Sequence, residues 1–75
     1  MDETILRIIN VVLTNAGKAN IIALSDETHL RNDIGLDSFN LAELTVRLEE
    51  EFGIDVFEKG LINTVGELKN RLSNE

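Results

Sequence analysis

The stretch GLDSFNLAEL, residues 35–44, joins a glycine turn to the start of a helix and decides how the rest of the chain is interpreted. From Ser38 onward, apolar residues recur at helical spacing as far as Phe52, and Gly53 follows as a helix stop. The pattern predicts a helix over residues 38–52. It also places a lone hydroxyl, that of Ser38, at the mouth of that helix.

A first helix is predicted over residues 4–16, with Thr4 as its N-cap and Gly17 as its C-terminal stop. Its apolar stripe comprises Ile5, Ile9, Val12 and Ala16. The connection over residues 17–37 is long for a compact domain, and such loops are often functional. We expect it to be pinned to the core by apolar anchors. These anchors are Ile21, Ile22, Leu24, Leu30, Ile34 and Leu36.

A last helix is predicted from Thr64, because Thr64 and Glu67 have the spacing of a capping box. Its apolar stripe comprises Val65, Leu68 and Leu72. The segment from 54 to 61 is expected to hold one short helical turn around VFEKG, residues 56–60. The chain is therefore expected to form one all-α domain over residues 1–75, a small four-helix bundle of three main helices and one short helix.

Composition excludes several kinds of site. The 75 residues include no Cys and one His, so no disulfide, thiolate metal site or His-rich zinc cluster is possible, and no metal site is expected. No apolar run approaches the ~20 residues of a membrane span, so a cytoplasmic protein is expected. The chain is also expected to be a monomer. The chain is too small for a deep, well-supported enzyme pocket.

The net charge of −7 lies entirely within residues 33–58. That window holds eight acids and a single base, Arg47, whereas the acids and bases of the remaining chain balance. A solvated face explains such a cluster, and so does a docking surface for basic partner proteins. Nucleic acid is excluded as a natural partner because its phosphates would be repelled.

A helical wheel of residues 38–52 separates two apolar faces. The core stripe comprises Leu41, Leu44, Leu48 and Phe52. A second strip, Phe39, Ala42 and Val46, lies on nearly the opposite side, and the acids Glu43, Glu49 and Glu50 border it. An exposed apolar strip with an acidic rim fits a docking site. The alternative is a helix that lies between two others and buries both faces.

Ser38 is a poor nucleophile in its sequence context. His29 is the only imidazole, no rule places it beside Ser38, and the G-x-S-x-G elbow is absent. A calcium loop fails because Arg31 occupies the position of the required glycine. Two interpretations remain open: Asp37 or Ser38 caps the helix, or Ser38 is an exposed attachment point that another enzyme modifies.

The segment DIGLDSFNLAELTVRLEEEFGIDV, residues 33–56, resembles the modification region of acyl carrier proteins. That family has Asp-Leu-Gly-x-Asp-Ser-Leu followed by a helix ending in Glu-Glu-Glu-Phe. The first half is matched by Asp33, Ile34, Gly35, Asp37 and Ser38. The second half is matched by Glu43, Leu44, Leu48, Glu49, Glu50, Glu51 and Phe52. The similarity extends over nearly the whole chain, since TVGEL at residues 64–68 resembles the start of the family's last helix.

The resemblance implies that a phosphopantetheinyl transferase attaches 4'-phosphopantetheine to Ser38, and that Asp37 assists transferase recognition and helps to hold its metal. It implies a non-enzymatic carrier that holds acyl groups as thioesters for fatty-acid, polyketide or related biosynthesis. Partners would be acyl-carrier synthetases, ketosynthases, acyltransferases and other thioester-using enzymes with basic patches. The implied docking residues are Phe39, Ala42, Glu43, Val46, Glu49 and Glu50. The implied acyl-cleft residues are Leu41, Leu48, Phe52, Ile54 and Ile62.

Three departures from the family pattern indicate a specialised carrier. Phe39 replaces the leucine after the serine, Arg47 interrupts the acidic helix, and the segment between Phe52 and Val65 is short and lacks proline. Cargo is left open, because peptidyl, polyketide and D-alanyl carriers share the architecture. The alternative function is an unmodified acidic helical domain that binds a basic protein.

Overall fold

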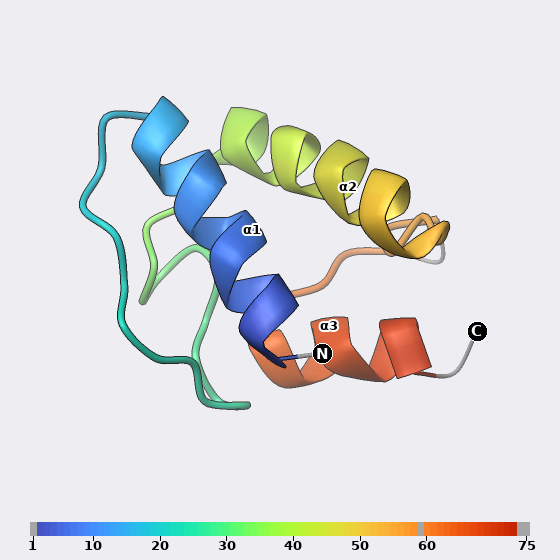
Figure 1. The fold of residues 1–75 in the computed structure, drawn as a ribbon. Coiled ribbons are helices and arrows are strands. Elements are labelled where there is room, and N and C mark those ends of the chain that lie inside the picture. Colours follow the sequence, from blue (N-terminus) through green and yellow to red (C-terminus); the bar gives the residue numbers. More distant parts are fainter. Residues whose placement is uncertain (1, 59, 74–75) are drawn as a thin grey trace.

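The computed structural model describes residues 2–58 and 60–73, and three helices account for its regular structure. They are α1 (Asp2–Asn15), α2 (Ser38–Phe52) and α3 (Val65–Ser73). Figure 1 shows α1 packed beside α2, with α3 beneath them and the long connection passing around the outside of α1. In the described part of the chain there is no strand, only one isolated bridge between His29 and Thr64. The all-α prediction is confirmed.

Helix α1 begins at Asp2, so the prediction that Thr4 is its N-cap is wrong. Asp2 and Glu3 lie in the first turn, where negative charge is favoured by the helix dipole, and Thr4 lies inside the helix. The predicted stop at Gly17 is confirmed. Gly17 has φ +74°, and the amide of Lys18 donates to the carbonyl of Leu13 at 2.8 Å, which closes the helix end.

The core lies between the three helices and receives anchors from the connection of residues 16–37. Leu30 and Leu36 are buried, and Ile21, Leu24 and Ile34 pack against the core in part. Ile22 does not anchor the connection as expected, because it is 96% exposed. Its neighbour Ile21 is held instead, since the Asn10 side chain accepts from the Ile21 amide at 2.8 Å and donates to its carbonyl at 3.0 Å.

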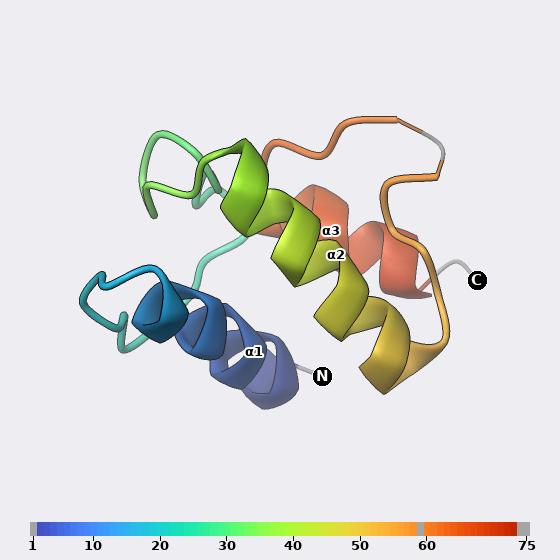
Figure 2. The ribbon, with the colours of Figure 1, turned by 90° about the horizontal axis from the view of Figure 1, so that it is seen from above.

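The predicted short helix around residues 56–60 is not formed by the described residues, so the four-helix bundle is a wrong expectation. Residues 56–58 form a turn. The amide of Glu58 donates to the carbonyl of Asp55 at 3.3 Å, and the amide of Gly60 donates to the carbonyl of Phe57 at 3.1 Å. Lys59 lies outside the described residues. The side chain of Arg71 reaches from α3 and donates to the carbonyls of Val56 at 2.8 Å and Gly60 at 3.2 Å. The carbonyls of Val56 and Gly60 thus bond to the Arg71 side chain and not to amides of a helix. Figure 2 shows this segment passing along the outer side of α2 and α3.

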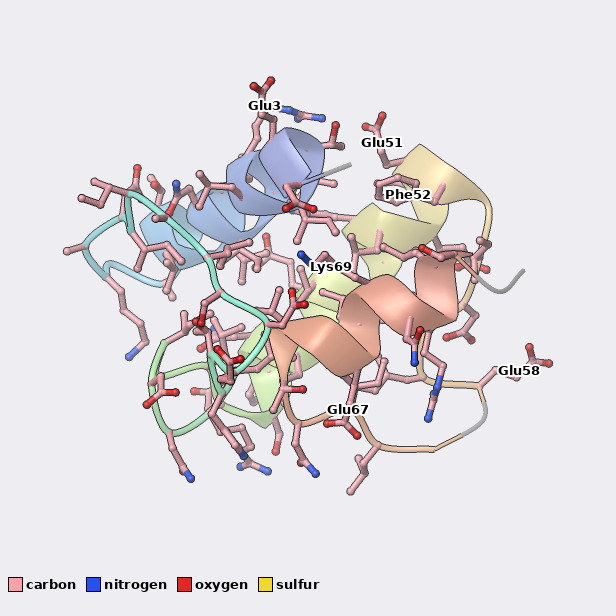
Figure 3. The ribbon with its side chains drawn as sticks, turned by 90° about the horizontal axis from the view of Figure 1, so that it is seen from below. Glu3, Glu51, Phe52, Glu58, Glu67 and Lys69 are labelled. Atoms are coloured by element: carbon pink, nitrogen blue, oxygen red, sulfur yellow. The ribbon has the colours of Figure 1, made fainter. Side chains whose placement is uncertain are left out.

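The capping box predicted at the start of α3 is confirmed. The Glu67 carboxylate accepts from the Thr64 amide at 3.0 Å, and the Glu67 amide donates to the Thr64 hydroxyl at 3.2 Å. Hydrogen bonds from the backbone of Asn63 and Thr64 lower the pKa of Glu67. Lys69 points from α3 toward the start of α1 (Figure 3) and pairs with Asp26 at 2.7 Å and Asp2 at 3.2 Å. Three segments distant in sequence are therefore tied together at this end.

None of the described helices combines the length and the apolar character that crossing a membrane requires.

Candidate modification site at the start of α2

Ser38 is the first residue of α2 and its side chain is exposed. Within the described residues its hydroxyl has no hydrogen-bond partner. The turn before it is fixed: Gly35 has φ +88°, and the amide of Leu36 donates to the carbonyl of Leu30 at 3.0 Å while Leu36 itself is buried. The hydroxyl is thus presented to solvent from a backbone that is held on both sides.

Asp37, not Ser38, caps the helix. The Asp37 carboxylate accepts from the amide of Asn40 at 2.8 Å, and the Asn40 side chain accepts from the amide of Asp37 at 3.1 Å. This reciprocal capping box keeps the Ser38 hydroxyl out of the cap. The sequence analysis considered Asp37 and Ser38 as caps but did not identify the role of Asn40. Asp followed three residues later by Asn was the available signal.

Among the described residues no hydrogen bond joins His29 to Ser38. The His29 Nδ1 atom accepts from the backbone amides of Arg31 at 3.2 Å and Asn32 at 3.1 Å. Its own amide donates to the Asp33 carboxylate at 2.7 Å. The imidazole therefore organises the turn of residues 29–33, a structural role that the sequence alone did not indicate.

An open pocket of about 250 Å³ adjoins Ser38. The side of α2 and the segment after it form its apolar walls, and Arg31 contributes a cation. The lining residues include Arg31, Ser38, Leu41, Ala42, Phe57 and Leu61. Of the predicted acyl-cleft residues, only Leu41 reaches this pocket. Leu48 and Ile62 lie in the core, and Phe52 and Ile54 pack against it.

The outer strip of α2 faces solvent. Phe39 is 87% exposed, Val46 is 55% exposed, and Ala42 between them is exposed too. The opposite stripe contains Leu44 and Leu48, both fully buried. The alternative in which α2 lies between two helices and buries both faces is therefore excluded for these residues.

The three acids predicted to border the strip differ in their surroundings. Glu49 and Glu50 are exposed, whereas Glu43 is half-buried and turned toward α1. The Glu43 carboxylate accepts from the Asn15 side chain at 2.8 Å and from Arg47 Nε at 2.9 Å. These bonds lower the pKa of Glu43, and the bond from Asn15 has the larger effect. Arg47 is occupied by the same carboxylate, and the i,i+4 spacing of the two residues was a signal that the sequence analysis did not use.

Among the described residues, no group of three or more His, Asp or Glu side chains is arranged to hold a metal ion. The site consists instead of an exposed hydroxyl, a capped helix, an apolar strip and the exposed acids Glu49 and Glu50. Fold and site together define a small helical module that presents one exposed serine at the start of α2.

Comparison with known proteins supports that class. Residues 4–72 match the family model described as the phosphopantetheine attachment site. An acyl carrier protein from Rickettsia bellii (strain RML369-C) is 34% identical over 56 residues, which are 75% of this chain and 64% of that protein. This chain thus spans a little under two thirds of its relative's length. No solved structure matches the chain significantly.

The chain belongs to the phosphopantetheine attachment family, and it is similar to an acyl carrier protein. Membership implies covalently attached 4'-phosphopantetheine. The residues present fit that group, because an exposed hydroxyl without an internal partner adjoins a pocket with apolar walls and one cation.

Proposed function

We propose that Ser38 carries the 4'-phosphopantetheine and that the chain presents acyl cargo to partner enzymes of fatty-acid, polyketide or related biosynthesis. The observation that carries the proposal is the exposed Ser38 hydroxyl, left free by the Asp37–Asn40 capping box at the start of α2. The attached group supplies a terminal thiol that holds acyl groups as thioesters. The protein itself binds, positions and displays it, and performs no catalysis.

The fold contributes three things to this work. Asp37 fixes the helix start, so that a phosphopantetheinyl transferase meets Ser38 in one backbone geometry and Asp37 at its side. Phe39, Ala42 and Val46 offer partner enzymes an apolar strip to bury. Glu49 and Glu50 offer exposed negative charge that speeds and orients encounter with basic patches. Glu43 borders the same strip but is already paired, so its share in docking is smaller.

Shelter of an acyl chain between the helices would require movement. Leu48 and Ile62, two of the proposed cleft residues, are buried in the core, and Phe52 and Ile54 cover it. The segment after α2 is held by turn bonds and by Arg71, and its Val56 is buried, so opening a cleft there would break these contacts. We place the cleft at the junction of α2 with this segment. A cytoplasmic monomer is the state we propose for the carrier.

The test is an intact-mass measurement. The purified chain is incubated with coenzyme A and a broad-specificity phosphopantetheinyl transferase, and we expect one added phosphopantetheine. Ser38→Ala should abolish the addition, whereas Ser25→Ala, at another exposed serine, should leave it intact. No mass change in the wild-type chain would reject the carrier function and favour an unmodified acidic domain that binds basic proteins.

A further inference from the structure

The pocket beside Ser38 has an uneven lining. Leu41, Ala42, Phe57 and Leu61 supply apolar surface, and Leu61 remains 80% exposed although it is a large aliphatic side chain. None of the described residues that line the pocket is acidic, although the surrounding residues 33–58 carry the whole net charge. Arg31 is the charged residue among the described lining residues. The pocket thus suits a ligand with one anionic end and an apolar body.

Arg31 differs from the other arginines in having no side-chain partner within the described residues. Arg7 pairs with Glu51 at 3.1 Å, Arg47 pairs with Glu43 at 2.9 Å, and Arg71 donates to two carbonyls. A guanidinium offers planar, bidentate donors that match a phosphate or carboxylate. Arg31 therefore brings an unused anion-binding group to the rim of the pocket that contains Ser38.

The far wall of the pocket is in place before any ligand arrives. Phe57 and Leu61 lie on the segment after α2, and Arg71 binds the carbonyls of Val56 and Gly60 on that segment. The Phe57 amide also donates to the Asp55 carboxylate at 3.1 Å. A preformed wall lowers the ordering cost of binding.

We propose that Arg31 is a positioning residue that binds the phosphodiester joined to Ser38 and directs the following apolar part of the arm into this pocket. The inference rests on the proposed attachment at Ser38 and goes beyond it, because it assigns the arm a resting place on the carrier itself. The argument is one of charge: the phosphodiester adds a negative charge next to the Asp37 carboxylate, and Arg31 is the unpaired cation in the adjoining pocket. The branched dimethyl portion of pantetheine, which follows the phosphate, suits the walls made by Leu41, Phe57 and Leu61.

The experiment uses the loaded full chain as wild type, Arg31→Gln, Arg31→Lys and Leu61→Ser. Lys18→Gln is the matched control, since it removes one exposed cation from the same connection without touching the pocket. Arg31 and Leu61 are both exposed, so circular dichroism should show unchanged folding. Loading of each variant is verified by intact mass before any comparison. A wild-type chain that never loads tests the proposed function and not this inference.

Two readouts follow on loaded protein. In wild type we expect loading to shift the backbone amide resonances of Leu41, Phe57 and Leu61. Arg31→Gln should remove most of those shifts and raise the rate at which the terminal thiol reacts with a disulfide reagent about two- to fivefold, as for the loss of one partly exposed charge-assisted contact. Arg31→Lys should give shifts and a rate between those of wild type and Arg31→Gln. Leu61→Ser should raise the thiol reaction rate without removing most of the amide shifts. Lys18→Gln should match wild type in both readouts.

The inference is overturned if loaded Arg31→Gln and Lys18→Gln both behave as wild type. It is also overturned if loading leaves the three pocket amides unmoved in the wild-type chain. If Arg31→Gln cannot be loaded while Lys18→Gln can, Arg31 belongs to transferase recognition, and the proposed resting place is rejected.

Discussion

The Asp37 carboxylate accepts a hydrogen bond from the Asn40 amide at 2.8 Å, and the Asn40 side chain accepts one from the Asp37 amide at 3.1 Å. This pair determines where α2 begins. Asn40 is 8% exposed and Asp37 is exposed, so the pair joins the surface of the helix start to its buried side. Because Asp37 is the cap, the neighbouring hydroxyl of Ser38 is not needed to hold the start of the helix and stays available for modification.

The capping pair gives a first prediction about stability. Asp37→Ala should lower the free energy of unfolding by about 1 kcal/mol, because it leaves an amide of the first helical turn without its acceptor. Ser38→Ala should change stability by less than about 0.5 kcal/mol, since the hydroxyl contacts no partner. Urea unfolding followed by circular dichroism measures both. Equal losses for the two variants would contradict the assignment of Asp37 as the cap.

The exposed strip gives a second prediction. Phe39→Asp should leave the melting temperature nearly unchanged, because the ring is 87% exposed, yet it should weaken association with enzymes that accept the carrier. Leu44→Ala, on the buried side of the same helix, should destabilise by about 2–5 kcal/mol. Thermal unfolding and titration against a partner enzyme separate the two effects. Collapse of Phe39→Asp would show that the strip is interior after all.

Glu43 gives a prediction about pH. Hydrogen bonds from Asn15 and Arg47 lower the folded-state pKa of this carboxyl below its ordinary value of 4.5, so the unfolded chain binds the proton more readily. The resulting stabilisation is fully present above the ordinary pKa and is lost as pH falls through the lowered folded pKa. Wild type should therefore be more stable than Glu43→Gln at neutral pH, and the difference should shrink in acid.

Melting curves of both chains from pH 7 to pH 3 provide the measurement. The comparison with Glu43→Gln matters because acid also relieves repulsion among the other carboxylates, which acts in the opposite direction in both chains. Glu49→Gln is the control, since the Glu49 side chain is exposed. A stability gap for Glu43→Gln that stays constant over this range would be evidence against the Asn15 and Arg47 contacts.

The crowded acids of residues 33–58 give a fourth prediction. Eight acids with a single base in that window repel one another, and Arg47 is already paired with Glu43. Millimolar magnesium or calcium should raise the melting temperature by screening this repulsion, and monovalent salt should do so more weakly. Calorimetric scans with and without the ions test the expectation. If neither the divalent ions nor the monovalent salt changed the melting temperature, charge crowding would be rejected as a source of instability.

Local patterns in the sequence were sufficient for much of the fold. The bounds of α2 agree with the prediction at both ends, and the Thr64–Glu67 box starts α3 as expected. These features depend on residues within one helical turn of each other, which is why they can be read from the chain. The errors at Thr4 and Ile22 have one cause: local spacing marks the candidates but does not say which of several neighbours is used.

The segment after α2 shows the other limit. Its composition allowed a short helix, but its carbonyls at Val56 and Gly60 accept from Arg71, a residue of α3. The pairing of Glu43 with Asn15 likewise joins two helices and could not be found from helical periodicity on α2 alone. In both cases a contact distant in sequence decides what a side chain does.

The sequence by itself determined the three helices, the glycine stops, the concentration of charge and the serine at the mouth of α2, because each depends on composition or on neighbours a few residues apart. Only the tertiary structure decided which face of α2 meets solvent, which distant side chain pairs with Glu43 and which cation shares a pocket with Ser38. Those outcomes depend on how α1, α2 and the segment before α3 pack together, and packing is a property of the whole chain in space.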